Sequence, residues 1–139
     1  LLPRPETARR YYPKRAGPKS TMQVTVTTID EFIHSHRVES IHVLKFDIQG
    51  GELMALQGAI ETLKEKHVPI IYAETMFIPH YEGNPLFYEL WSFLANFRYT
   101  LFDVYHLHRA TNGQLRYGDA LFVSPKIREA VINSYQEEP

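Results

Sequence analysis

Three acidic side chains stand where two predicted strands end and a predicted helix begins. Asp47 lies near the end of an apolar strand expected at 41–48, and Glu74 ends the strand expected at 69–74. Glu52 opens the helix that follows Asp47. Because ligands in open α/β sheets bind beyond the carboxyl ends of the strands, we expect the three carboxylates to share one rim. Acids at such a rim can act as a general base, bind a metal ion or hold substrate hydroxyl groups.

A lysine in the first of these strands needs a partner. Lys45 lies two residues before Asp47, so the two side chains share one face of the strand. An ammonium group buried in a sheet is costly unless it is paired. The sequence therefore predicts that Lys45 pairs with Asp47 or Glu74, or that the strand is exposed at this point.

Histidine and tyrosine side chains are further candidates for substrate or metal binding. His80 and Tyr81 follow the strand that Glu74 ends, and this loop position is the reason to expect substrate contact from them. His106 and His108 lie two apart in an expected strand and form a possible metal pair, although an exposed edge strand accounts for them better. The sequence contains neither a Gly-x-Ser-x-Gly nucleophile elbow nor a phosphate-binding loop.

The elements that would position these residues alternate between strands and helices. Thr28 and Glu31 match a capping box at the start of a short helix, and Asn112-Gly113 is typical of a hairpin turn. This order predicts an α/β fold in which helical crossovers join parallel strands and the chain closes in an antiparallel hairpin. The expected strands are 23–28, 41–48, 69–74, 99–108 and 120–123, and the expected helices are 28–36, one from Glu52 to about 67 with Ile60 on its apolar face, and one that begins at Asn84-Pro85.

Composition limits the classes of protein to which the chain can belong. Its 139 residues fit one domain, and 44% hydrophobic residues are enough for a packed core. A net charge of −1 argues against a nucleic-acid binder, and the absence of cysteine excludes disulfides, thiolate zinc sites and cysteine nucleophiles. No apolar run approaches the roughly 20 residues that span a bilayer. No signal peptide is visible either, so we expect a cytoplasmic protein without a membrane partner.

The first 20 residues differ in charge from the rest of the chain. They hold six basic side chains, one acidic side chain and four prolines, whereas the remaining residues carry nine basic and 15 acidic groups. Proline removes backbone donors, so regular structure is not expected there. We interpret 1–22 as a basic arm or linker, with a solvated linker favoured over an arm that touches an anionic partner. The domain would then span 23–125, followed by a C-terminal tail at 126–139.

Residues 45–52, K-F-D-I-Q-G-G-E, resemble the K-x-D-[VI]-E-G-x-E signature of the FkbM-type methyltransferases. Glu74 stands where this family has an acid that ends the next strand. Two positions depart from the family pattern, because Gln49 replaces a glutamate and Arg98 replaces the glycine of a G-Y pair. The resemblance runs over about residues 24–124. The other similar segments are T-I-D-E-F at 28–32, which resembles T-[LI]-D-x-[FL], L-Q-G-A at 56–59, which resembles L-x-G-A, and G-D-A-L-F at 118–122, which resembles D-x-[LI]-F.

The resemblance implies a Rossmann-like methyltransferase fold with a seven-stranded sheet, whose first half binds S-adenosylmethionine over a glycine-rich turn. The sequence has no G-x-G turn before Ile41. We therefore expect a fragment that contains the second, acceptor-side half of the fold. The cofactor, S-adenosylmethionine, would be bound mainly by the other half, so its binding residues are unassigned here. The fragment by itself is expected to be inactive.

The reaction implied by the resemblance is methyl transfer from S-adenosylmethionine to a hydroxyl group of a sugar or a secondary metabolite. Asp47 would orient or deprotonate this hydroxyl, Lys45 would position Asp47, and Glu74 would hold a neighbouring hydroxyl. No metal ion belongs to this expectation. The residues expected to bind the substrate are Glu52, which would hold another hydroxyl, His80 and Tyr81.

Two other classes of function stay open at this point. One is a non-catalytic remnant or interaction module, and the other is a metal-dependent enzyme that uses Asp47, Glu52 and Glu74 as oxygen ligands. If half of the sheet is absent, the strand at 41–48 has an unpaired edge. Bare apolar edges tend to pair. We therefore expect a homo-oligomer, other self-association, or capture of part of the basic arm along that edge.

Overall fold

The computed structural model describes residues 22–65, 68–80 and 82–132. These residues form a mixed α/β fold with a four-stranded sheet, which confirms the α/β part of the predicted fold class. The predicted basic arm, apart from Met22, lies outside the described residues. Tyr81 of the predicted substrate site lies outside them as well.

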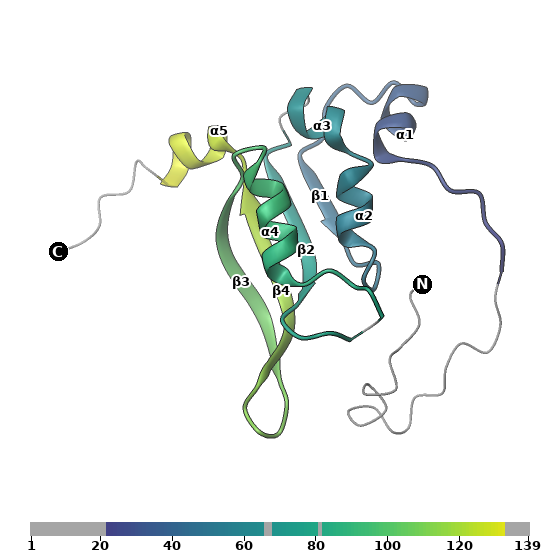
Figure 1. Cartoon of the computed structure of the whole chain (residues 1–139). Coiled ribbons are helices and arrows are strands. Elements are labelled where there is room, and N and C mark those ends of the chain that lie inside the picture. Colours follow the sequence, from purple (N-terminus) through teal and green to yellow (C-terminus); the bar gives the residue numbers. More distant parts are fainter. Residues whose placement is uncertain (1–21, 66–67, 81, 133–139) are drawn as a thin grey trace.

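Four strands form one mixed sheet. β1 (Val43–Phe46) pairs in parallel with β2 (Ile70–Met76), and β2 pairs antiparallel with β4 (Leu115–Val123). β3 (Thr100–Arg109) pairs antiparallel with β4 at the opposite edge, so the strand order is β1-β2-β4-β3 (Figure 1). The predicted parallel pair and the closing antiparallel hairpin are therefore confirmed.

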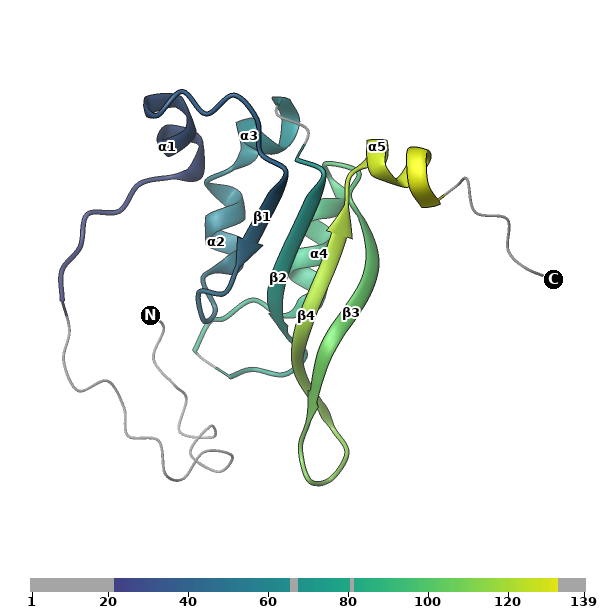
Figure 2. The same cartoon turned by 180° about the vertical axis from the view of Figure 1, so that it is seen from behind.

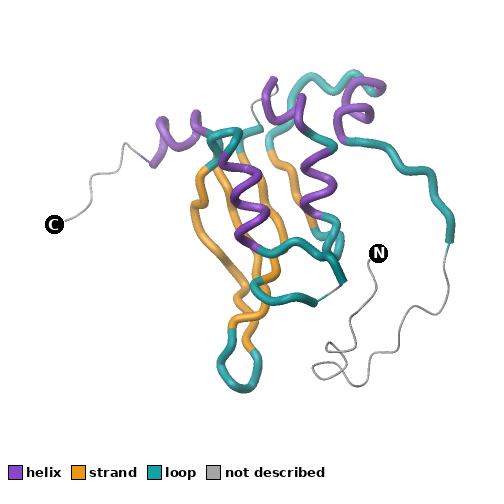
Figure 3. The backbone as a smooth tube through the Cα atoms, viewed as in Figure 1, coloured by secondary structure: helices purple, strands orange, loops and turns teal. Residues whose placement is uncertain are grey.

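Helices lie along one face of the sheet, and the other face carries no helix from the described residues (Figures 1, 2 and 3). α2 (Glu52–Gln57) and α3 (Ile60–Glu65) form the crossover between β1 and β2, and α4 (Phe87–Ala95) connects β2 to β3. α1 (Ile29–Ser35) packs beside α3. None of the helices in the described part of the chain is long and apolar enough to cross a membrane.

The hydrophobic core fills the space between the sheet and these helices. Burial alternates along β2, because successive side chains of a strand point to opposite faces. Ile71 and Ala73 are fully buried against the helices, whereas Tyr72 and Glu74 lie on the open face and are half-buried. The sheet therefore presents polar groups on the face that the helices leave open. Other core side chains are Phe46, Leu56, Leu63, Leu90, Leu94 and Phe122.

The start of α1 is docked onto the break between α2 and α3. Thr28 Oγ1 accepts a backbone N–H of the first turn of α1 (3.1 Å), which is the first half of the predicted capping box. Asp30 caps α3 instead of its own helix, because its carboxylate accepts the backbone N–H groups of Glu61 (3.0 Å) and Thr62 (2.8 Å). Gly58 permits this close approach, since a Cβ there would lie 3.2 Å from Thr28 Cβ.

The strand predicted at 23–28 is wrong. This segment has no regular secondary structure, and the side chains of Val24 and Val26 are 65% and 85% exposed. Its β-branched composition favours a strand, but a strand also needs a neighbour with which to pair. No described strand lies beside it, since β1 pairs with β2 alone in this part of the chain.

Two helix predictions also need correction. The single helix expected from Glu52 is divided into α2 and α3, and Ile60 at the start of α3 is exposed rather than part of the apolar face. α4 begins after Leu86, not at Asn84, because the Glu89 side chain accepts the Leu86 backbone N–H (2.8 Å). Asn84 instead accepts the backbone N–H of His80 (3.2 Å), which fixes the loop before the helix.

The predicted C-terminal tail begins with helical structure. α5 (Pro125–Ile127) follows β4 directly and continues as a π-helical turn, η2 (Arg128–Ile132). Ser124 caps α5, since its Oγ accepts the backbone N–H of Ile127 (3.4 Å). The chain therefore leaves the sheet at the end of β4 through an ordered turn.

Candidate active site

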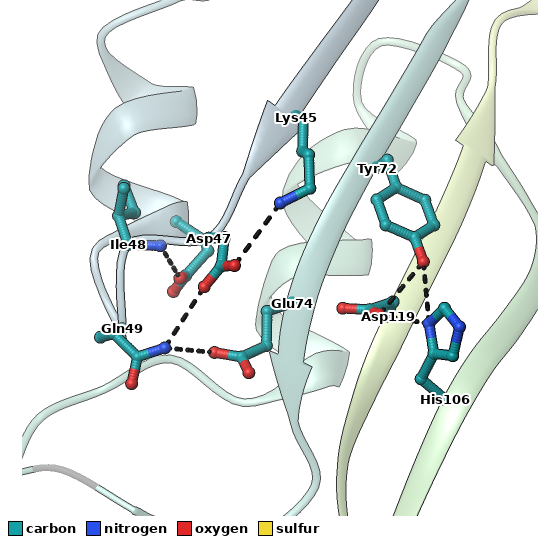
Figure 4. Close-up of polar contacts among 9 residues, drawn as sticks. Lys45, Asp47, Ile48, Gln49, Tyr72, Glu74, His106 and Asp119 are labelled. Carbon is teal, nitrogen blue, oxygen red and sulfur yellow. Dashed lines mark hydrogen bonds and ion pairs between the residues drawn. The ribbon is translucent and has the colours of Figure 1, made fainter.

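Two carboxylates meet where the pairing of β1 with β2 ends. The register pairs Phe46 with Ala73, so Asp47 and Glu74 follow one step later on adjacent strands. Gln49 joins them, because its Nε2 donates to Asp47 Oδ1 (3.3 Å) and to Glu74 Oε2 (3.0 Å) (Figure 4). The structure thus brings two of the three predicted acids together, but only Asp47 follows the end of its strand. The expectation that Glu74 ends its strand is wrong, because β2 continues to Met76 to pair with β4.

The third acid, Glu52, supports the turn between β1 and α2. It is buried, its Oε1 accepts the backbone N–H of Ile48 (3.0 Å), and its Oε2 accepts that of Gly50 (2.9 Å). This geometry gives Glu52 a structural role in place of the predicted contact with substrate. The turn needs such support, because Gln49 has a positive φ of 56°, which is unfavourable for a residue with a side chain.

The carboxyl group of Glu74 has a raised pKa, and burial is the largest cause. Neighbouring negative charges raise the pKa further, and the positive charge of Lys45 opposes them. A carboxylate with a raised pKa binds a proton more readily, which suits a group that receives one during a reaction. The neighbouring charges belong to Asp47, Glu52 and Asp119.

Lys45 forms an ion pair with Asp47 at the surface. Its Nζ lies 3.5 Å from Asp47 Oδ2, and the two side chains are 61% and 55% exposed. Both alternatives for this lysine are therefore present, since it is paired and its strand is exposed. An exposed pair of this kind contributes about 0–1 kcal/mol to stability, so its main effect is on the orientation of the carboxylate.

A second polar cluster crosses β2, β4 and β3 on the same open face (Figure 4). Tyr72 donates its hydroxyl to Asp119 Oδ2 (3.1 Å), and His106 Nδ1 lies 2.7 Å from the same oxygen. The Tyr72 oxygen also lies 3.3 Å from His106 Nδ1. Asp119 is the register partner of Glu74, so this cluster adjoins the Asp47–Gln49–Glu74 rim.

Sequence spacing did not reveal this cluster. It suggested His106 and His108 as a possible metal pair, whereas the His108 ring stacks on Tyr117, with the ring centres 4.3 Å apart. Within residues 22–65, 68–80 and 82–132, no group of three or more His, Asp or Glu side chains could hold a metal ion. Tyr72 and Asp119 are 47 residues apart, and only the pairing of β2 with β4 brings them together.

A scan against protein-family models matches residues 3–101 to the methyltransferase FkbM domain. The chain belongs to the FkbM methyltransferase family. Searches of curated proteins and of solved structures gave no significant match. The family match includes the rim residues and ends inside β3, so His106 and Asp119 lie beyond it.

The structure accounts for one departure from the FkbM signature. The amide of Gln49 donates to both Asp47 and Glu74, and an amide can do this without adding charge. A glutamate at this position, as the family pattern has, would instead place a third negative charge between two carboxylates. Gln49 therefore holds the two acids of this FkbM domain together where a carboxylate would push them apart.

Contacts of the buried His80 with β4 hold the loop after β2 in this FkbM domain. His80 is 5% exposed, and its Nε2 lies 2.8 Å from Nη2 of the buried Arg116 on β4. The His80 ring also meets the Tyr117 ring edge-on, with the ring centres 5.5 Å apart. These contacts give His80 a part in holding the loop, and its burial does not favour the predicted direct contact with substrate.

Proposed function

We propose that this chain supplies the acceptor side of an S-adenosylmethionine-dependent O-methyltransferase that acts on a hydroxyl group of a sugar or a secondary metabolite. Membership of the FkbM family supports methyltransferase chemistry. The observation that carries the assignment of the site is the bridge from Gln49 to Asp47 and Glu74, which holds two carboxylates together where the parallel pairing of β1 with β2 ends. Strand ends of this kind are where open α/β sheets bind ligands.

The rim also suits a cationic cofactor. Burial and neighbouring carboxylates raise the pKa of Glu74, and a positive charge nearby would relieve that repulsion. S-adenosylmethionine, when bound, supplies a methyl group that is already activated as a sulfonium cation. Asp47 and Glu74 are the residues of this chain that would face such a charge.

The residues of the rim have distinct parts in this proposal. Asp47, held by Gln49 and Lys45, orients or deprotonates the acceptor hydroxyl. Glu74, whose pKa is raised, holds a neighbouring hydroxyl and can share its proton. Orientation of the acceptor oxygen toward the methyl group is the main requirement, because the donor needs no further activation.

The test is to measure methyl transfer by the intact protein and its Asp47→Asn variant. Release of S-adenosylhomocysteine would be followed with a panel of sugars and hydroxylated aromatic acceptors. We expect a loss of about 100- to 10,000-fold in kcat for Asp47→Asn, as for removal of a general base. Glu39→Gln, which changes an exposed acid before β1, is the matched control. Unchanged turnover in Asp47→Asn rejects Asp47 as an essential group.

The metal-dependent alternative makes a different prediction for the same assay. It requires Glu52 as a ligand, but both oxygens of Glu52 accept backbone N–H groups of the turn. Activity that is lost to a chelator and restored by a divalent cation would favour that alternative. Methyl transfer that persists in chelator supports the rim as a site that acts without a metal ion.

A further inference from the structure

The Tyr72–His106–Asp119 cluster has the form of an oriented acid–base group. A single oxygen, Asp119 Oδ2, accepts a hydrogen bond from the Tyr72 hydroxyl (3.1 Å) and lies 2.7 Å from His106 Nδ1 (Figure 4). Each residue comes from a different strand, so the sheet itself holds the three side chains in place. A histidine whose Nδ1 is held by a carboxylate is the usual arrangement for a proton acceptor.

The contact with Asp119 also decides which ring nitrogen of His106 is free. An ionised carboxylate only accepts hydrogen bonds, so Nδ1 must carry the proton that lies toward Asp119. In the neutral ring, Nε2 then has an unshared electron pair. The His106 side chain is 72% exposed, and no residue in the described part of the chain bonds its Nε2. Nε2 is therefore open to a ligand on the uncovered face.

The backbone is distorted where it presents this histidine. His106 has a φ of 47°, in the left-handed region, and the register of β3 with β4 shifts between Tyr105 and His108. A bulge of this kind re-aims a side chain, and such strain collects at functional sites. Gly118, beside Asp119, is required for it, because a Cβ there would lie 2.9 Å from both the Tyr105 oxygen and Leu107 Cδ2.

The cluster and the rim form one polar strip on the open face of the sheet. Asp119 and Glu74 are register partners, and the charge of Asp119 contributes to the raised pKa of Glu74. Lys45 is in turn the register partner of Tyr72, so the strip reaches from β1 to β3. A ligand that contacts Asp47 and Glu74 on this face therefore approaches the cluster as well.

We propose that His106 is the catalytic residue that accepts the proton of the acceptor hydroxyl, with Asp119 and Tyr72 as positioning residues. This role rests on the proposed function and refines it, because His106 then accepts the proton of the reacting hydroxyl. Asp47 follows β1, three strands from β3, so it binds another group of the same acceptor. The O–H proton moves to Nε2, and an oxygen electron pair forms the bond to the methyl carbon. The carbon–sulfur bond breaks and leaves its electron pair on sulfur. The imidazolium that results is stabilised by the charge of Asp119.

The first test needs no cofactor and no substrate. Long-range proton–nitrogen NMR correlations of the full chain, labelled with 15N-histidine, report which ring nitrogen carries the proton, and loss of signals in His106→Gln assigns His106. We expect the neutral ring to be protonated at Nδ1 in the wild type and to populate both tautomers in Asp119→Asn. A wild-type ring protonated at Nε2 would overturn the proposal.

The second test follows the pH dependence of methyl transfer by the intact protein with the same acceptor panel. We expect His106→Gln to lower kcat about 100- to 10,000-fold with little change in KM, and to remove the acidic limb of the pH profile. Asp119→Asn should lower kcat less than His106→Gln, and its positioning role is read from the tautomer measurement. The matched control is His108→Gln, on the same strand. Titratable groups around His106 are Tyr72, Glu74, Asp119 and Lys45, with Tyr105 and His108 on its own strand.

The outcomes separate this inference from the function on which it rests. Full activity with an unchanged acidic limb in His106→Gln overturns the role of His106, and the proposed function stands if Asp47→Asn is still impaired. A wild-type protein that transfers no methyl group to any hydroxyl overturns the proposed function and this role with it. Loss of the acidic limb in His106→Gln, with the limb kept in His108→Gln, supports both the role of His106 and the proposed function.

Discussion

At the scale of single residues, two partly buried carboxyl groups have pKa values shifted in opposite directions. Burial raises the pKa of Glu74, and the surrounding acids raise it further. Burial alone would raise the pKa of Asp30 as well, but hydrogen bonds from Thr62 and Glu61 outweigh it, so the pKa of Asp30 is lowered. The charged form of Glu74 in the rim is therefore disfavoured, whereas the charged form of Asp30 at the cap of α3 is favoured.

Glu74→Gln should change how stability depends on pH. Above the usual pKa of 4.5, the unfolded chain releases a proton that the folded Glu74 still holds, so stability falls as the pH rises toward the raised pKa. Glu74→Gln lacks this loss and should gain stability over the wild type as the pH rises to neutrality. Urea unfolding from acid to neutral pH measures it, with the exposed Glu65→Gln as the control. Parallel curves for wild type and Glu74→Gln would contradict the prediction.

At the scale of elements, the FkbM-like segments 28–32 and 56–59 act together. Thr28 caps α1, and Asp30 in the same turn caps α3, at the point where Gly58 ends α2. The segments therefore join three short helices, each of which would be only marginally stable in isolation. α2 begins at the rim turn, so this junction also fixes one side of the candidate site.

Asp30→Ala should destabilise the fold by about 1–2 kcal/mol, because three hydrogen bonds to the start of α3 are lost. The pKa of Asp30 is lowered, so the stability it gives is present near neutral pH and is lost as the pH falls through that pKa. The difference between the wild type and Asp30→Ala should therefore shrink in acid. Denaturant unfolding at several pH values measures this, with Glu31→Ala as the exposed control in the same turn. Equal losses in the two variants would argue against the cap.

Much of this organisation could be predicted from residue patterns, and the exceptions have physical causes. Asp47 and Glu74 were expected together because parallel strands end at one edge. The partners of Glu52 could not be foreseen, since they depend on the φ angles of a turn. The position of His106 depends on a bulge, and its partner Asp119 depends on which strand inserts beside β2. The segment 23–28 shows that composition alone does not make a strand.

At the scale of the whole molecule, β1 is an edge strand. In the described part of the chain it pairs with β2 alone, and its Val43 side chain is 52% exposed. Unpaired strand edges favour association with another chain. The expected homo-oligomer would therefore form along β1, beside the polar strip.

Val43→Lys should weaken this association, because a charged side chain on an edge strand opposes pairing. Sedimentation velocity over a range of concentrations should show self-association of the wild type and a shift toward monomer in the variant. Val131→Lys, which changes an exposed valine in η2, should have no such effect. A wild type that stays monomeric at every concentration would contradict the prediction.

The polar strip also protects the sheet from a slipped alignment. Side chains alternate between the two faces of a strand, so a shift of β4 by one residue would turn Asp119 into the core and expose Phe122. Gly118 adds a second constraint, because only a residue without a Cβ can stand where β3 comes so close. The residues that we assign to chemistry therefore also mark the correct alignment of the strands that carry them.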